Sequence, residues 1–182
     1  MSLPQENLPV KMIRASLDDL PEFALPEGFA LRWYQPGDEV HWRRIHLAAE
    51  RFIEITPGLF CERFGVDTNL LHDRQCYLLD PCGEIIGTGT AWFADLEGSL
   101  WGRVHWMAVL PEFQGLGLGK ALLTAICQRL RELGHERAYL HTSAARIPAI
   151  KLYLQFGFQP VFRSSKEEAA WRNLFADLRR AR

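Results

Sequence analysis

The fold is most visible in one segment, Val109-Leu110-Pro111-Glu112-Phe113-Gln114-Gly115-Leu116-Gly117-Leu118-Gly119-Lys120, where three of the chain's 14 glycines fall within five residues. An alternating apolar stretch over 100–110 precedes it, and an apolar stripe at helical spacing from Leu122 to Leu133 follows it. The segment is therefore expected to join a strand to a helix. Backbone amides at a helix N-terminus are unpaired and favour anions, and glycine lets a phosphate approach them closely. We expect this loop to bind a phosphorylated ligand.

Two common nucleotide-binding patterns do not fit the glycine spacing. The GxGxxG pattern of dinucleotide-binding folds needs a third glycine where this chain has Lys120 or Leu122, depending on the starting glycine. The GxxxxGK pattern of P-loops needs a glycine at the position of Gln114 and a Ser or Thr at the position of Ala121. The spacing therefore excludes both kinds of nucleotide site.

The spacing that fits is Gln-x-x-Gly-x-Gly, formed by Gln114, Gly117 and Gly119. It resembles motif A of the GNAT superfamily of acetyl-CoA-dependent N-acetyltransferases, which lies between the fourth strand and the third helix of that fold. A second segment, 149–158, resembles the superfamily's A-x-x-L-Y-x-x-x-G-F pattern on the helix before its last core strand. The resemblance covers roughly residues 28–163, which is nearly all of the expected domain.

The composition is that of an ordinary globular protein. The chain has 182 residues, is 48% hydrophobic and carries 21 Lys and Arg against 22 Asp and Glu, for a net charge of -1. This balance does not indicate a nucleic-acid-binding protein, and no segment approaches the length of a membrane span. The four cysteines show no CxxC spacing, so no metal site is expected. We see no secretory signal and expect a cytoplasmic protein.

The periodicity predicts an α/β (α+β) fold: a mostly antiparallel central sheet flanked by helices, followed by a β-α-β crossover. We expect an irregular N-terminal arm over 1–27, a GNAT-like domain over 28–163, and a C-terminal helix within 164–182 that packs on the domain or in a homodimer interface. The expected strands are 29–34, 76–80, 84–93, 100–110, 137–142 and 158–162. The expected helices are 38–55, 59–64, one that begins at the glycine cluster and ends at Gly134, 148–156, and a final one that buries Trp171, Leu174, Phe175 and Leu178.

The resemblance implies a specific cofactor site. In the family the fourth and fifth strands splay apart, and the pantetheine arm of acetyl-CoA lies in the notch between them. By transfer, a backbone amide among Met107, Ala108 and Val109 polarises the thioester carbonyl. The amides that would surround the pyrophosphate are those of Gln114, Gly115, Leu116, Gly117, Leu118, Gly119 and Lys120. The implied reaction is direct attack of a primary amine, on a small molecule or a peptide, without an acyl-enzyme intermediate.

The resemblance also suggests catalytic side chains, each with a structural alternative. Tyr153 matches the general-acid tyrosine of the family, although it also fits a buried aromatic stripe. His105, which alternation places on the strand face of Met107, is a candidate general base or a structural histidine. Glu54, with Glu50 as a second rival, is a candidate base on the predicted first helix, or part of a solvated helix face.

Three points stay open from the residues alone. Arg146 stands where many family members have Asn, and it either meets a cofactor phosphate, meets an acidic acceptor or is solvated. A non-catalytic acyl-CoA-binding module is one alternative function. An interaction protein that uses Trp171, Phe175 and the basic C-terminal tail is another.

Overall fold

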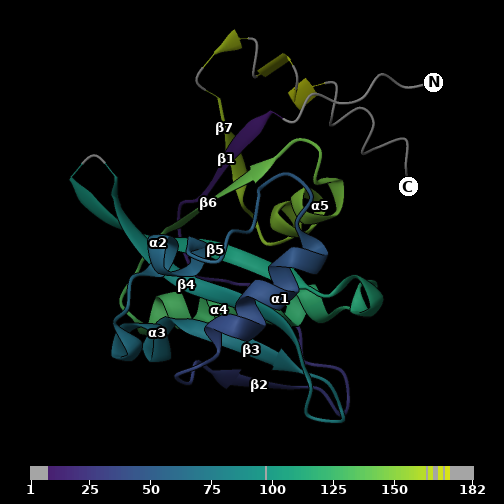
Figure 1. Cartoon of the computed structure of the whole chain (residues 1–182). Coiled ribbons are helices and arrows are strands. Elements are labelled where there is room, and N and C mark those ends of the chain that lie inside the picture. The colour runs from purple at the N-terminus through teal and green to yellow at the C-terminus, as the bar shows by residue number, and fades with distance from the viewer. Residues whose placement is uncertain (1–7, 97, 163, 166–167, 170, 173–182) are drawn as a thin grey trace.

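The chain forms one seven-stranded sheet with helices on both faces (Figure 1). The computed structural model describes residues 8–96, 98–162, 164–165, 168–169 and 171–172. The strand order is β2-β3-β4-β5-β6-β1-β7. Every neighbouring pair is antiparallel except β5 and β6, which are parallel. The predicted fold class, a mostly antiparallel mixed sheet, is confirmed. Within the described residues, no helix has the length and apolar character that crossing a membrane requires.

The first half of the domain builds an antiparallel sheet under helix α1. Its elements are β2 (Ala30–Trp33), α1 (Glu39–Ala49), α2 (Leu59–Phe64), α3 (Thr68–Arg74), β3 (Gln75–Leu79), β4 (Ile85–Leu96) and β5 (Ser99–Val109). Helix α3 is the one element of this half that the sequence pattern did not predict. The Asp67 carboxylate caps its N-terminus by accepting hydrogen bonds from the amides of Asn69 and Leu70.

Helix α1 ends six residues earlier than the predicted helix over 38–55. After Ala49 the Glu50 carboxylate accepts hydrogen bonds from the amides of Arg51 and Phe52, at 3.0 and 2.8 Å. A side chain that bonds the following backbone offers it an alternative to the helical ladder, so the helix stops there. Glu54 is therefore in an exposed loop, and Phe52, expected on the buried face, is 44% exposed.

The second half contains the β-α-β crossover and the predicted splay. Its elements are the short 3-10 helix η1 (Pro111–Phe113), α4 (Leu118–Glu132), β6 (Ala138–Ser143), α5 (Ile147–Gln155) and β7 (Gln159–Val161). Strands β5 and β6 pair only from Gly102–Val104 to Ala138–Leu140. Beyond that point the described residues of the two strands are unpaired with each other, although both strands continue. The splayed strands expected from the resemblance are these two.

The prediction of an irregular arm over 1–27 is wrong for six residues. Pro9–Arg14 form β1, which lies between β6 and β7 and pairs antiparallel with both (Figure 1). The alternate residues Val10 and Met12 are buried, which gives the segment the period of a strand. Its hydrogen-bonding partners lie more than 120 residues away, so no local signal marked it. The division of the chain into an arm, a domain and a C-terminal helix stays a prediction.

The C-terminal helix is described only in part. Trp171 is buried against the core of the domain, and its ring centroid lies 6.1 Å from that of Phe162. Leu174, Phe175 and Leu178, which we expected on the buried face, lie outside the described residues. A homodimer interface on this helix stays a prediction.

Candidate active site

A β-bulge at Trp106 shapes the middle of β5. Thr90 of β4 pairs with His105 and Thr88 pairs with Ala108, so Trp106 and Met107 together oppose the single residue between the two threonines. Trp106 has φ +46°, which is uncommon for a residue with a Cβ. The bulge lies just past the last β5–β6 pair, at the mouth of the notch between the splayed strands.

The bulge corrects the expectation that His105 shares a face with Met107. His105 and Trp106 both face the α1–α2 side: the His105 ring centroid lies 5.5 Å from that of Phe64, and the Trp106 ring lies 5.1 Å from that of Trp42. The Met107 side chain lies on the α4 side, because a Cβ added at Gly89 would meet it at 3.3 Å together with the Ile126 side chain. Side chains alternate between the two faces of a strand only where each residue pairs with one residue of the neighbouring strand.

The glycine loop has the geometry of an anion site. Gly115 and Gly117 have φ +85° and +81°, a region that residues with a Cβ enter at a cost, and Gly117 is the N-cap of α4. A Cβ at either glycine would meet no neighbour within 4 Å, so backbone conformation, not crowding, requires glycine there. Gln114 anchors the loop, since its Nε2 donates to the Val109 carbonyl at 2.9 Å.

The free amides of this loop are fewer than the sequence suggested. The Gln114 and Lys120 amides donate to the carbonyls of Pro111 and Gly117. Within the described part of the chain, the five amides of 115–119 make no hydrogen bond to protein. They lie at the start of a helix of 15 residues, where the helix dipole favours negative charge, and Gly115, Leu116 and Gly117 are exposed. These amides fit a diphosphate.

Tyr153 lies on α5, the helix that follows β6. Leu152, its neighbour in sequence, lies 3.6 Å from where a Cβ on Gly119 would be, which packs α5 against the first turn of α4. The Tyr153 side chain is buried, and its ring lies 6.2 Å from that of Phe158. Burial raises the pKa of the Tyr153 phenol to about 12, although the Arg146 cation acts in the opposite direction. The phenol is therefore protonated at neutral pH.

His105 and His46 are buried in a cationic, aromatic environment. Burial is the main cause that lowers the pKa of His105 to about 2, and the charges of Arg103, Arg63 and other histidines contribute in the same direction. Burial lowers the pKa of His46 to about 3, against a raising contact with the Trp106 backbone. His46 is only 2% exposed, and its ring centroid lies 5.0 Å from that of Trp106. Both imidazoles are neutral in the folded protein.

These two histidines predict a protein that loses stability in acid. Their folded pKa values lie below the ordinary 6.5, so the unfolded chain binds protons that the folded chain does not once the pH falls below that value. The stabilisation is complete above pH 6.5 and is lost towards pH 3. We expect a fall from pH 7 to pH 5 to cost about 2 kcal/mol for each histidine. Denaturant unfolding at both pH values measures it.

The control for this prediction is a histidine outside the buried pair. His105→Asn should make the loss of stability between pH 7 and pH 5 visibly smaller, whereas His41→Asn on α1 should leave it as in the unmodified protein. An equal pH dependence in all three proteins would contradict the assignment of the effect to buried imidazoles.

Arg146 binds an acidic partner within the chain itself. Its Nη2 donates to both carboxylate oxygens of Glu50, at 2.6 and 2.7 Å, and its guanidinium carbon lies 5.4 Å from the Phe52 ring centroid. The Glu50 side chain is 7% exposed and that of Arg146 is 31% exposed. This ion pair joins the end of α1 to the start of α5. Glu54, four residues further along the exposed loop, is not part of it.

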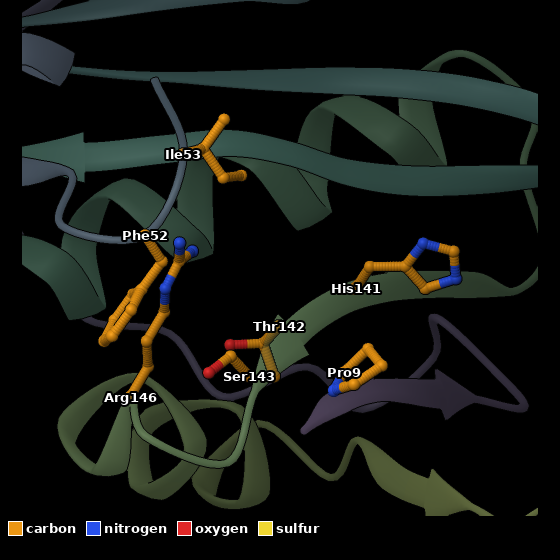
Figure 2. A pocket seen from close by; sticks show the side chains of 7 residues that line it. All are labelled: Pro9, Phe52, Ile53, His141, Thr142, Ser143 and Arg146. Carbon is orange, nitrogen blue, oxygen red and sulfur yellow. The ribbon is translucent and has the colours of Figure 1, made fainter. Parts of the chain in front are cut away.

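A shallow hollow of about 190 Å³ opens beside this ion pair, at the end of β6. Figure 2 shows Phe52 and Arg146 on one side of it and His141 and Pro9 on the other, with Thr142 and Ser143 between them. The Thr142 hydroxyl is buried, and it has no hydrogen-bond partner within the described residues. The sequence patterns missed this hollow and the role of Phe52. Glu50 and Arg146 were visible as charges, but their 96-residue separation hid the contact.

Comparison with known proteins agrees with this arrangement. Residues 30–158 match the family model of the acetyltransferase (GNAT) family. The chain is 37% identical over 149 residues to a mycothiol acetyltransferase of Pseudarthrobacter chlorophenolicus, covering 77% of this chain and 45% of that protein. It is 34% identical over 155 residues to a mycothiol acetyltransferase of Arthrobacter sp. (strain FB24), covering 80% and 47%. The chain thus spans about half the length of these curated relatives.

A solved structure shows the same fold. The GCN5-related N-acetyltransferase from Sphaerobacter thermophilus superposes with a TM-score of 0.63 at 22% identity, covering 84% of this chain and 48% of that one. The chain belongs to the GNAT family of acetyltransferases.

Proposed function

We propose that the chain transfers an acetyl group from acetyl-CoA to a primary amine by direct attack. Three features support this proposal: the edges of β5 and β6 that are unpaired with each other, the free amides of 115–119, and the buried Tyr153 on a helix that packs against the first turn of α4. The family uses acetyl-CoA, and the loop supplies donors for its diphosphate. This chain spans about half the length of the curated relatives. We therefore infer its acceptor from its own residues and not from the names of those relatives.

The proposed reaction is a single transfer that forms no acyl-enzyme intermediate. The amine nitrogen attacks the thioester carbonyl carbon, the C–S bond breaks, and the departing sulfur takes a proton from the Tyr153 hydroxyl. Backbone amides of β5 at Met107, Ala108 or Val109 stabilise the oxyanion. Because the pKa of Tyr153 is about 12, its hydroxyl is protonated at neutral pH and can donate this proton. This tyrosine favours catalysis over a module that only binds acyl-CoA.

The amine must lose a proton, and the two candidate bases, His105 and Glu54, differ in how exposed they are to solvent. His105 is 9% exposed, and its pKa of about 2 makes it a weak base in the free protein. Glu54 is exposed in the loop over 50–57, next to Phe52 and Ile53 of the hollow. These settings favour Glu54, or water at the notch, over His105 as the proton acceptor.

Acetyl-CoA is expected to stabilise the folded chain. A ligand that binds only the native state at 100 times its Kd adds about 2.7 kcal/mol, which corresponds to a rise in Tm of roughly 5–10 °C for a chain of this size. Differential scanning fluorimetry with acetyl-CoA measures the shift. Gly117→Val should reduce it, because valine opposes the positive φ of the N-cap and disturbs the donor loop.

Two controls make this measurement specific. Gly98→Val places the same change at a positive φ of +77° in the β4–β5 turn, away from the loop, and should keep the acetyl-CoA shift. Desulfo-CoA, which keeps the diphosphate, should also stabilise the protein. The absence of any shift with saturating acetyl-CoA would contradict the proposed function.

A further inference from the structure

Three adjacent strands carry basic and aromatic side chains and no acidic residue. The strands β1, β5 and β6 contain no Asp or Glu, although the whole chain has 22 of them. Arg103 of β5 is in register with Tyr139 of β6, and Lys11 of β1 is in register with His141 of β6. Alternate residues of a strand share a face, so these side chains lie on the face of His105, the α1–α2 side.

Distances confirm that this face is continuous. The Arg103 guanidinium carbon lies 5.6 Å, and the Lys11 Nζ 5.4 Å, from the centroid of the Tyr139 ring. The His141 ring lies 5.5 Å from the same ring. We call the basic side chains here the cationic face, and they are Lys11, Arg63, Arg103 and Arg137.

The cationic face keeps its charge. Within the described ranges, its four members form no ion pair with a carboxylate, whereas Arg32, Arg129 and Arg146 each bind one elsewhere. The Arg103 Nε is buried and has no hydrogen-bond partner among the described residues. A buried donor without a partner costs free energy, and an anionic ligand would remove that cost.

This face borders the notch where acetyl transfer is proposed. Arg103 lies three residues before the bulge at Trp106, which is roughly 10 Å along an extended strand. Arg103 and Arg63 both act on His105 and lower its pKa, so both charges lie near the end of the β5–β6 pairing. The hollow lined by His141 and Ser143 adjoins the same face.

We propose that the acceptor is an amine that also carries a carboxylate or a phosphate, and that Arg103, helped by Lys11 and Arg63, binds this anionic group. The backbone of Arg103 lies roughly 10 Å along β5 from the bulge that borders the notch. Arg103 is then a specificity-determining residue on the acceptor side, distinct from the amides that hold the diphosphate of the cofactor. This inference rests on the proposed function.

Matched acceptor pairs test this inference. We would measure kcat/KM with acetyl-CoA for glucosamine 6-phosphate against glucosamine, and for the peptide amide Ala-Ala-Glu against Ala-Ala-Gln. The two pairs distinguish a phosphate from a carboxylate. At least one anionic member should be preferred by roughly 10-fold or more, as expected for a charge-assisted hydrogen bond. The preference should shrink as the ionic strength rises.

Variants locate the preference. Arg103→Gln should lower the ratio of anionic to neutral kcat/KM by roughly 10-fold, and Arg63→Gln, on an exposed position, should lower it less. Arg131→Gln, an exposed arginine of α4, is the matched control and should keep the ratio of the unmodified protein. A melting curve for each variant shows whether Arg103→Gln still folds, and Arg63→Gln tests the face independently.

Binding measurements separate the two proposals. Isothermal titration of the CoA-bound protein with the same four compounds reports acceptor binding without turnover. Preferred binding of an anionic compound that Arg103→Gln abolishes supports the cationic face even where no acetyl transfer occurs, in which case the proposed function fails alone. Equal binding and equal turnover within both pairs, or a preference that survives both variants, would overturn the inference.

Discussion

Tyr153→Phe is expected to lower kcat by roughly 100-fold or more, while the affinity for acetyl-CoA changes by less than about twofold. General-acid groups typically contribute 10²–10⁴-fold to rate, and the substitution removes the hydroxyl alone. The ring remains, so its contact with the Phe158 ring at 6.2 Å is kept and the fold is preserved. Steady-state kinetics with a thiol-trapping reagent gives kcat, and fluorimetric titration gives the affinity for acetyl-CoA.

The pH dependence sharpens this expectation. With a pKa of about 12, Tyr153 is protonated throughout the range from pH 6 to pH 9. The unmodified protein should therefore show no fall in kcat at alkaline pH from this group. Any rise in kcat with pH reports deprotonation of the amine substrate or of the general base that takes its proton.

Another buried tyrosine serves as the control. Tyr34 is 4% exposed, and its hydroxyl donates to Glu39 at 3.2 Å, away from the notch. Tyr34→Phe should keep kcat near that of the unmodified protein. Unchanged turnover in Tyr153→Phe would remove it from the mechanism. A loss of acetyl-CoA affinity without a loss of kcat would make it a cofactor-binding residue instead.

Local patterns predicted the parts of the fold that depend on neighbours in sequence. The helix at 59–64 is predicted to the residue, because Gly58 and Gly65 bound a short apolar run. The strand–loop–helix around the glycines is predicted because its periodicity changes within a few residues. The fold class and the family follow from these local features.

The features that local patterns missed depend on contacts between distant segments. Strand β1 is defined by β6 and β7, and its six residues give too short an alternation to distinguish it from an arm. The bulge at Trp106 depends on the register between β4 and β5, and this register cannot be predicted from the sequence of either strand alone. That one extra residue changed the surroundings of His105 and, with them, its suitability as a base.

Arg146→Gln is expected to raise the acceptor KM by roughly 10-fold and to lower the free energy of unfolding by about 2 kcal/mol. Removing the cation leaves the Glu50 carboxylate unpaired where its side chain is only 7% exposed. Loss of one partner of a fully buried pair costs about 3–5 kcal/mol, and the partial exposure of Arg146 reduces this figure. The KM rises because the pair holds the segment that carries Phe52 and Ile53 over the hollow.

The two halves of this ion pair should respond unequally. Glu50→Gln leaves Arg146, whose side chain is 31% exposed, and water can solvate that charge, so the loss of stability should be smaller than for Arg146→Gln. The double variant Glu50→Gln/Arg146→Gln should recover part of the stability, because no buried charge is left unpaired. Arg51→Gln, an exposed arginine of the same loop, is the matched control and should change neither quantity.

Stability and KM together decide what Arg146 does. If it bound a phosphate of the cofactor, Arg146→Gln would weaken acetyl-CoA, and the double variant would not restore that affinity. If it positions the loop through Glu50, the KM for acetyl-CoA stays near its original value while the acceptor KM rises in both single variants. An acceptor KM that is unchanged in both would contradict the positioning role, whatever the loss of stability. The Nη2 of Arg146 already donates to both carboxylate oxygens of Glu50, whereas Arg103 forms no ion pair with a carboxylate among the described residues, so we expect the anion of an acidic acceptor at Arg103 rather than at Arg146.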